Sequence, residues 1–282
     1  MLGGRLCGFG HTVPDIYVIG LGLVGTHQIT GEGWHALRSA KSVFVLHFDP
    51  LVVRSLEREV GPVDTLDDLY ELGLDRRVTY RRMADRVVQV AVEGGPVCLA
   101  LYGHPLVFVT PTSLIVEEGR RRGLKVKVQP GISALDCILV DLNVDPASEG
   151  LQQYEATDML LRERPLQPDV PSVIWQIGTV GLATFRGFGS IPAEGYAELV
   201  AYLLRFYPST HEVAVVRTAT SPLGRSRILR TTVGNISSLA SDITSADTMF
   251  IPAVERRAIT NTRLSEQMAI GVESERASST RS

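Results

Sequence analysis

The sequence has few cysteines, no long apolar run and no excess of positive charge. Its three cysteines, Cys7, Cys98 and Cys137, are odd in number and far apart, which argues against a disulfide framework or a zinc knuckle and favours a reducing cytoplasm. The longest apolar stretches fall far short of the ~18 residues that a membrane-spanning helix needs, so we expect no membrane partner. Lys and Arg number 28 against 31 Asp and Glu. That balance makes nucleic acid a poor candidate partner, because phosphate binding usually demands a basic excess.

The composition is that of a globular protein large enough for two domains. Hydrophobic residues make up 44% and charged residues 21% of the 282 positions, and a domain averages about 150 residues. We expect a flexible leader without a signal-peptide core, two α/β domains and a tail rich in Arg, Ser, Thr and Glu. The boundaries predicted for these parts are 1–14 for the leader, 15–131 for the N-terminal domain, 132–254 for the C-terminal domain and 255–282 for the tail, which we expect to be mobile from about residue 265.

Short β-branched and apolar runs alternate with helical patterns in the N-terminal part. This alternation is typical of a doubly wound sheet of parallel strands. The runs that predict strands are residues 15–20, 42–48, 97–102 and 124–128. The patterns that predict helices are residues 33–40, 76–93 and 111–122.

The pattern changes after Pro130 and Gly131. Ser133 is placed to cap a helix that runs through Leu142, because its hydroxyl can accept a hydrogen bond from the first turn. Further strands are predicted at 172–177, 211–217, 225–232 and 248–251, with 225–232 antiparallel; a helix is predicted at 194–206 and a helical turn at 236–239. A second α/β unit therefore begins near residue 132.

Three glycine-bearing loops follow predicted strands. Gly20-Leu21-Gly22-Leu23-Val24-Gly25 matches a dinucleotide fingerprint, with Asp49 after the next strand, which leaves a dehydrogenase as one possibility. A sharp turn after a strand needs glycine without any ligand, however, and the loop is longer than a fingerprint loop. The other two loops lie at 101–109 and 129–134. Because carboxyl ends of parallel strands bind ligands, the three loops together predict a cofactor cleft.

The three loops resemble those of the tetrapyrrole methylase superfamily, which uses S-adenosylmethionine held between two α/β domains. The resemblance covers about residues 15–253. A longer string is similar to the borosin peptide α-N-methyltransferases, which methylate backbone amides of a ribosomal precursor peptide. That string comprises Tyr-Gly-His-Pro at 102–105, Val-Phe-Val at 107–109, Pro-Gly-Ile-Ser-Ala-Leu-Asp-Cys at 130–137, Tyr-Glu-Ala-Thr-Asp at 154–158 and Trp-Gln-Ile-Gly at 175–178.

The resemblance implies a cofactor site for S-adenosylmethionine on both domains. The residues that it places there are Gly20, Leu21, Tyr102, His104, Val107, Phe108, Ser133, Ala134, Gln176 and Thr248. A structural role for His104, as a loop histidine hydrogen-bonded to the backbone, is an equally good interpretation. No HExxH or CxxC motif is present, so we expect no metal.

The resemblance also implies catalytic groups before and within the helix at 76–93. Arg76 and Tyr80 match the family's Arg-x-x-x-Tyr, and Tyr70 matches the tyrosine of its Asp-Leu-Tyr. Four residues apart, Arg76 and Tyr80 share a helical face, where a guanidinium would favour the phenolate. A surface pair on a solvated helix is the alternative.

This chain departs from the borosin pattern between Tyr70 and Arg76. The family carries a further catalytic tyrosine there, whereas this chain has Leu72, Gly73 and Leu74. Three interpretations stay open: Tyr70 or Tyr80 is the base, the nucleophile is more acidic than an amide, or methyl transfer is slow.

We expect a cytoplasmic, homodimeric methyltransferase that acts on a separate peptide. The reason for a separate peptide is the polar character of the last ten residues, which form no apolar substrate core. The alternatives are a small-molecule methylase of the tetrapyrrole type, the dehydrogenase, and a non-catalytic peptide-binding relative.

Overall fold

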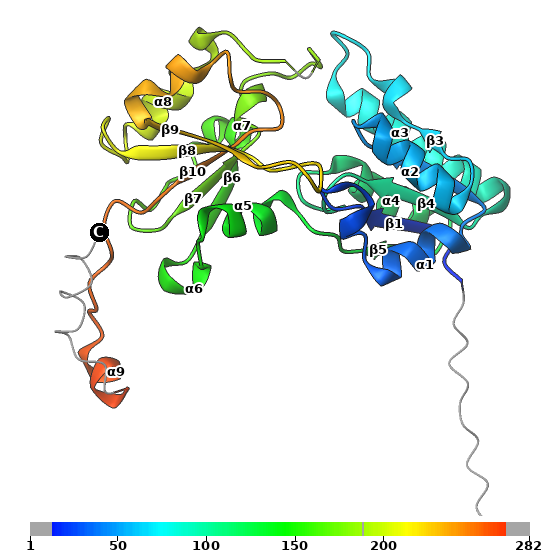
Figure 1. The fold of residues 1–282 in the computed structure, drawn as a ribbon, viewed down its shortest axis with the longest axis horizontal. Coiled ribbons are helices and arrows are strands. Elements are labelled where there is room, and N and C mark those ends of the chain that lie inside the picture. Colours follow the sequence, from blue (N-terminus) through cyan, green and yellow to red (C-terminus); the bar gives the residue numbers. More distant parts are fainter. Residues whose placement is uncertain (1–12, 188, 269–282) are drawn as a thin grey trace, which may run out of the picture.

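The computed structural model describes residues 13–187 and 189–268, and these form two α/β domains side by side (Figure 1). The expected α/β fold with two domains is confirmed. The predicted leader up to residue 12 and the tail beyond residue 268 lie outside the described residues. Within the described ranges, no helix is long and apolar enough to cross a membrane, and no group of three metal-ligating side chains occurs.

The N-terminal domain is built on a five-stranded parallel sheet in the order β3-β2-β4-β1-β5. Its strands are β1 (Ile16–Gly20), β2 (Ser42–Leu46), β3 (Asp64–Thr65), β4 (Val97–Leu101) and β5 (Val126–Gln129). Its helices are α1 (Gly31–Ser39), α2 (Pro50–Val60), α3 (Arg76–Gly94) and α4 (Thr110–Arg121), with the short turns η1 (Gly25–Gln28) and η2 (Asp67–Leu69). Alternate residues of each strand face opposite layers: Ile16 and Val18 pack with α3 and α4, whereas Tyr17 and Ile19 pack with α1 and α2.

The C-terminal domain holds a mixed sheet in the order β6-β7-β10-β8-β9. Its strands are β6 (Gln152–Glu155), β7 (Ser172–Trp175), β8 (Glu212–Arg217), β9 (Arg227–Thr232) and β10 (Thr248–Ile251). Its helices are α5 (Ala134–Leu142), α6 (Pro146–Glu149), α7 (Ala156–Leu161) and α8 (Ala197–Leu203), with η3 (Ile177–Thr179), η4 (Ala193–Tyr196) and η5 (Val233–Leu239), and α9 (Thr262–Gln267) follows the sheet. One face of the sheet packs on α7, α8 and η5, and the other packs on α5.

Several predicted elements have shifted bounds. The antiparallel strand predicted at 225–232 is confirmed as β9, which pairs with β8. The helix predicted at 194–206 is instead the short turn η4 followed by α8, because the chain enters it through a 3₁₀ turn after Pro192. The sequence analysis missed α2, although Asp49 caps it and Pro50 occupies its first turn, a strong start signal.

Close backbone contact joins the ends of β1, β4 and β5. A Cβ atom on Gly131 would lie 2.6 Å from the Cα of Gly20 and 2.8 Å from the carbonyl oxygen of Gly103. Gly22 and Gly103 have φ values of 71° and form an isolated antiparallel bridge. Only glycine fits such an approach of backbone to backbone. The three loops therefore meet at one edge of the first sheet.

We predict that Gly131→Ala destabilises the protein by about 1–3 kcal/mol, because the added methyl group meets backbone atoms that cannot move aside cheaply. Gly94→Ala at the end of α3 is the matched control, since a methyl group added there would meet no atom within 4 Å apart from its chain neighbours and the backbone of its own helix. Urea unfolding of both variants measures the difference. Equal stability of the two would contradict the close packing of the loops.

Candidate active site

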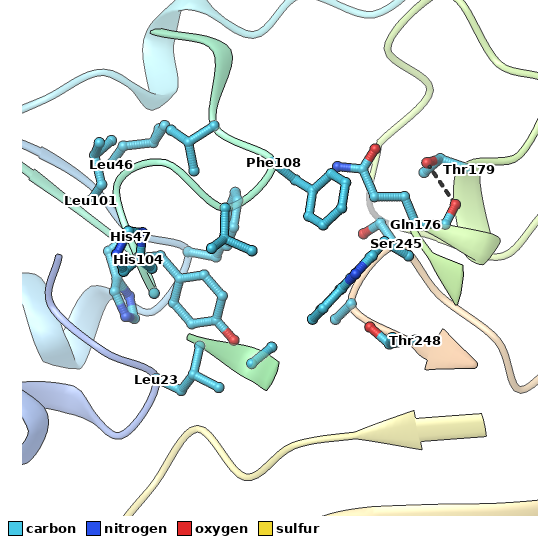
Figure 2. Close-up of a pocket in the computed structure, with 18 of the residues that line it drawn as sticks. Leu23, Leu46, His47, Leu101, His104, Phe108, Gln176, Thr179, Ser245 and Thr248 are labelled. Carbon is cyan, nitrogen blue, oxygen red and sulfur yellow. Dashed lines mark hydrogen bonds between the residues drawn. The ribbon is translucent and has the colours of Figure 1, made fainter. Parts of the chain in front are cut away.

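A cavity of about 610 Å³ lies between the two domains, beyond the carboxyl ends of β2 and β4. Cavities of ~300–1,000 Å³ are typical of small-molecule and cofactor sites. Figure 2 shows Leu46, Leu101, His47 and His104 on one side and Gln176, Thr179, Ser245 and Thr248 on the other, with Phe108 reaching toward the second group. The cavity thus depends on both domains.

The first glycine loop contributes Leu23 to this cavity. Gly20 and Leu21, which the sequence analysis assigned to the cofactor, do not line it. Leu21 is fully buried among the residues of α1 and α2, and its N–H donates to the carbonyl oxygen of Leu101 at 2.8 Å. The positive φ of Gly22 reverses the chain, so that Leu23 faces the cavity instead.

This loop does not have the geometry of a dinucleotide fingerprint. It passes through η1, and α1 begins only at Gly31, where Thr30 caps it by accepting from the Gly33 N–H at 3.0 Å. Asp49, which would bind a ribose in the dehydrogenase interpretation, accepts a hydrogen bond from the Leu51 N–H at 2.8 Å and caps α2. The glycines instead allow the first loop to pack tightly on the second, where Gly22 forms a bridge with Gly103.

The second loop places Tyr102, His104, Val107 and Phe108 in the cavity, as the sequence analysis expected. Nδ1 of His104 accepts a hydrogen bond from the Leu106 N–H at 3.1 Å. A neutral imidazole in this position carries its proton on Nε2, which leaves that atom as a donor. The structural and the ligand-binding interpretations of His104 are therefore compatible.

Phe108 connects the two domains across the cavity. Its backbone has a φ of 57°, a left-handed conformation that is uncommon for a bulky residue. Its ring lies 5.1 Å from the ring of Trp175, at the end of β7. Strained backbone of this kind occurs where surrounding structure holds a side chain in a required position.

The third loop brings Ser133 and Ala134 to the cavity at the start of α5. Ser133 and Asp136 form a capping box, in which the Ser133 hydroxyl accepts from the Asp136 N–H at 3.4 Å and Asp136 Oδ2 accepts from the Ser133 N–H at 2.7 Å. The Ser133 hydroxyl also donates to Asp136 Oδ2 at 2.7 Å. The Ser133 side chain is thus committed to the helix end, and the predicted start of this helix is confirmed.

The C-terminal domain contributes Gln176 and Thr248, both expected from the resemblance. Gln176 has a left-handed backbone (φ 57°), and its carbonyl oxygen accepts a hydrogen bond from the Thr179 hydroxyl at 3.2 Å (Figure 2). Thr248 is the first residue of β10 and is buried. These polar groups face the apolar and aromatic side chains of the N-terminal domain.

Tyr70, Arg76 and Tyr80 all line the same cavity. Asp75 caps α3 through the Arg77 N–H at 2.8 Å, so Arg76 stands at the helix start and Tyr80 one turn later. Among the described residues Arg76 forms no ion pair, whereas other arginines of α3 do. Those pairs are Arg77–Asp75, Arg82–Glu71 and Arg86–Asp68. No carboxylate of the described residues therefore pairs with the Arg76 guanidinium. Arg76 and Tyr80 line a cavity, so they are not a surface pair on a solvated helix.

The two tyrosine hydroxyls are hydrogen-bonded to each other. Burial raises the pKa of both, and Arg76 opposes that rise in each. Tyr80 stands on α3 one turn after Arg76, so its phenol lies beside a cation that favours the phenolate.

A second cavity of about 430 Å³ adjoins the first. The residues that line both are Arg76, Tyr80, Phe108, Val109, Thr110, Gln176 and Thr179. The residues that line the second cavity alone are Leu106, Ser113, Glu155, Thr157 and Leu182. Arg76 and Tyr80 therefore stand where the two cavities meet.

Sequence reasoning missed several residues of the first cavity. His47 directly follows β2 and is buried, and its burial lowers its pKa, so it is neutral near pH 7. Its ring lies 5.2 Å from that of Tyr102. Trp175 and Phe185 come from the C-terminal domain. The strand-end position of His47 was a usable signal, but the approach of Phe185 depends on how the two domains dock.

Comparison with known proteins places these observations in a family. Residues 15–237 match the model of the tetrapyrrole (corrin/porphyrin) methylases. Uroporphyrin-III-C-methyltransferase from Thermus thermophilus has a similar fold, with a TM-score of 0.61 and 18% identity over 85% of this chain and 92% of that one. A second structure of a Thermus thermophilus uroporphyrin-III C-methyltransferase, complexed with S-adenosylhomocysteine, gives a TM-score of 0.58 at 16% identity, over 84% of this chain and 96% of that one.

Curated relatives confirm the resemblance to the borosin enzymes. A methyltransferase/ribosomally synthesized cyclic peptide gymnopeptides precursor from Gymnopus fusipes is 30% identical over 86% of this chain and 58% of the relative. A type III borosin precursor from Anomoporia bombycina is 31% identical over 86% of this chain and 28% of the relative. This chain thus spans less than two thirds of either relative. The family match, which covers most of the residues, shows that the chain belongs to the tetrapyrrole methylases.

Proposed function

We propose that this protein is an S-adenosylmethionine-dependent methyltransferase that methylates backbone amide nitrogens of a separate precursor peptide. We further propose that it works as a homodimer in the cytoplasm. The observation that carries the proposal is the meeting of Arg76, Tyr80 and Tyr70 with the cofactor loops of both domains in one cavity. The borosin relatives, whose names combine a methyltransferase with a peptide precursor, support the substrate class.

The residues of the first cavity fit S-adenosylmethionine. Aromatic and apolar side chains such as Leu23, Tyr102 and Trp175 make most of its wall, and a few polar groups interrupt it. The Nε2–H of His104 and the hydroxyl of Thr248 are donors for the polar parts of the cofactor. When bound, the cofactor supplies an electrophilic methyl group on its sulfonium.

The chain must make an amide nitrogen nucleophilic, because a neutral amide is a very poor nucleophile. Tyr80 is the proposed base, and in this proposal the Tyr70 hydroxyl donates the hydrogen bond that stabilises the Tyr80 phenolate. The Arg76 guanidinium lowers the pKa of Tyr80 and is also available to stabilise negative charge on the amide oxygen. Tyr70, Tyr80 and Arg76 thus supply the groups that amide deprotonation requires without the additional family tyrosine.

The second cavity supplies a place for the peptide. It adjoins the first cavity at Arg76 and Tyr80, so a backbone segment there would lie next to both. Serine, threonine and glutamate side chains line much of it, and main-chain amides favour such polar surroundings. At this boundary the methyl group would pass from the cofactor in the first cavity to the peptide in the second.

We predict that the demethylated cofactor, S-adenosylhomocysteine, at millimolar concentration raises the melting temperature of the wild type, since a ligand that binds only the native state stabilises it. Ala134→Trp fills the cavity and should abolish the rise. Ala147→Trp, on the exposed α6, should retain it. A rise that survives in Ala134→Trp would contradict the placement of the cofactor; no rise in wild type would contradict its binding.

We predict that Tyr80→Phe lowers the single-turnover rate of peptide methylation by about a hundredfold or more, while the Kd for S-adenosylhomocysteine stays nearly unchanged. Only the hydroxyl is lost, so the packing of the ring is kept. Tyr70→Phe should have a smaller effect, because it removes the donor to Tyr80 and leaves the base. Mass spectrometry of the peptide and calorimetry measure the two quantities. A larger loss in Tyr70→Phe would reverse the assignment of the base.

The pH dependence follows from the raised pKa of Tyr80. Below that pKa the phenolate fraction grows about tenfold per pH unit, so the single-turnover rate should rise steadily from pH 7 to pH 9. Arg76→Ala removes a group that lowers this pKa, so it should move the profile to higher pH. A rate that is already constant above pH 7 would contradict a buried tyrosine as the base.

A further inference from the structure

The loop before α3 is joined to the C-terminal domain by main-chain hydrogen bonds. The Gly73 N–H donates to the Phe185 carbonyl oxygen at 2.8 Å, and the Phe185 N–H donates to the Leu74 carbonyl oxygen at 3.0 Å. Asp75 and Thr184 form an isolated antiparallel bridge beside them. We call residues 73–75 and 184–185 the interdomain bridge. Its two segments come from opposite domains at the top of the view in Figure 1.

The interdomain bridge lies next to the proposed catalytic groups along the chain. Asp75 takes part in the bridge through its backbone and caps α3 with its side chain. Arg76 is the first residue of that helix. The backbone at the start of α3, and with it the direction of the Arg76 side chain, is thus attached to the C-terminal domain.

Phe185 adds a side-chain contact to the same region. Its ring lies 4.9 Å from the ring of Tyr70, inclined by 38°. Phe185 is only 8% exposed and lines the first cavity together with Tyr70. Contacts between aromatic rings of this geometry restrict ring orientation. The hydroxyl of Tyr70, which is hydrogen-bonded to Tyr80, is therefore held partly from the other domain.

We infer that Phe185 is a positioning residue for methyl transfer, acting through Tyr70 and the start of α3. This inference rests on the proposed function. The catalytic arrangement of Tyr70, Tyr80 and Arg76 is complete only while the C-terminal domain is docked on the 73–75 loop. The site is thereby assembled when the two domains enclose the cofactor cavity.

The alternative is that Phe185 merely fills space in the C-terminal domain. Ile191 lies six residues later in the same domain and is equally exposed, at 8%. It belongs to the core of that domain and lines neither cavity. Ile191→Ala is therefore a matched control for a purely structural loss. Phe185→Leu keeps apolar volume while removing the ring, and tests whether the aromatic contact matters.

The test is a double-mutant cycle of Phe185→Ala and Tyr70→Phe, measured by single-turnover peptide methylation with saturating cofactor. We expect Phe185→Ala to lower the rate by roughly tenfold to a hundredfold with the Kd for S-adenosylhomocysteine little changed, because small misplacements of reacting groups are costly. In the Tyr70→Phe background the same change should have a much smaller effect. Phe185→Leu should recover little of the rate, and Ile191→Ala should leave it near wild type. Additive effects in the cycle, or an equal loss in Ile191→Ala, would overturn the inference.

Hydrogen exchange gives a readout that does not require turnover. The amides of Gly73 and Phe185 should exchange slowly in the wild type and faster in Phe185→Ala, with the strands of both sheets unchanged. Fast exchange of both amides in the wild type would overturn the interdomain bridge even if methylation occurs. If the wild type methylates no peptide, the proposed function fails and with it the catalytic role of Phe185, whereas the exchange result still decides whether the bridge exists.

Discussion

The site depends on the backbone contact among Gly20, Gly103 and Gly131. Gly20 ends β1, and Gly103 and Gly131 each lie two residues beyond the end of a neighbouring strand. A side chain on Gly20 or Gly131 would collide with the backbone of the other loops, and Gly103 has a positive φ that favours glycine. Their contact sets the course of the Tyr102–Phe108 loop and of the segment that leads to Ser133. That segment also connects the two domains. The contact among the three glycines therefore positions the N-terminal loops that line the cavity and also the start of the domain that forms the opposite wall.

The second domain completes the site at several places around the cavity. Phe108 meets Trp175, Gln176 and Thr248 form the opposite wall, and Phe185 reaches Tyr70. Burial and charge also act on the two tyrosines of the site. Burial raises the pKa of both Tyr70 and Tyr80, and the Arg76 guanidinium opposes that rise in each.

Local patterns in the sequence predict most of the fold, and non-local contacts account for what they miss. The cap at Ser133 and the alternating strands follow from residues close in sequence, so their positions are confirmed. The first loop is less readable from sequence: Gly20 and Leu21 were predicted to bind the cofactor, and the side chain of this loop that lines the cavity is Leu23, which follows the positive φ of Gly22. His104 and Gln176 line the cavity as the resemblance implied, and their roles toward the cofactor stay predictions. Phe185 could not be found in the sequence, since its approach to Tyr70 arises from the docking of two domains.

The most direct test of the account is the site of methylation itself. A synthetic peptide is incubated with the full chain and S-adenosylmethionine labelled in its methyl group, and fragment ions then locate the label. The account predicts label on backbone nitrogen atoms, and its loss when Tyr80 is replaced by Phe. Label on side chains only, or label on a tetrapyrrole but on no peptide, would contradict it, as would an unlabelled peptide with cofactor demonstrably bound.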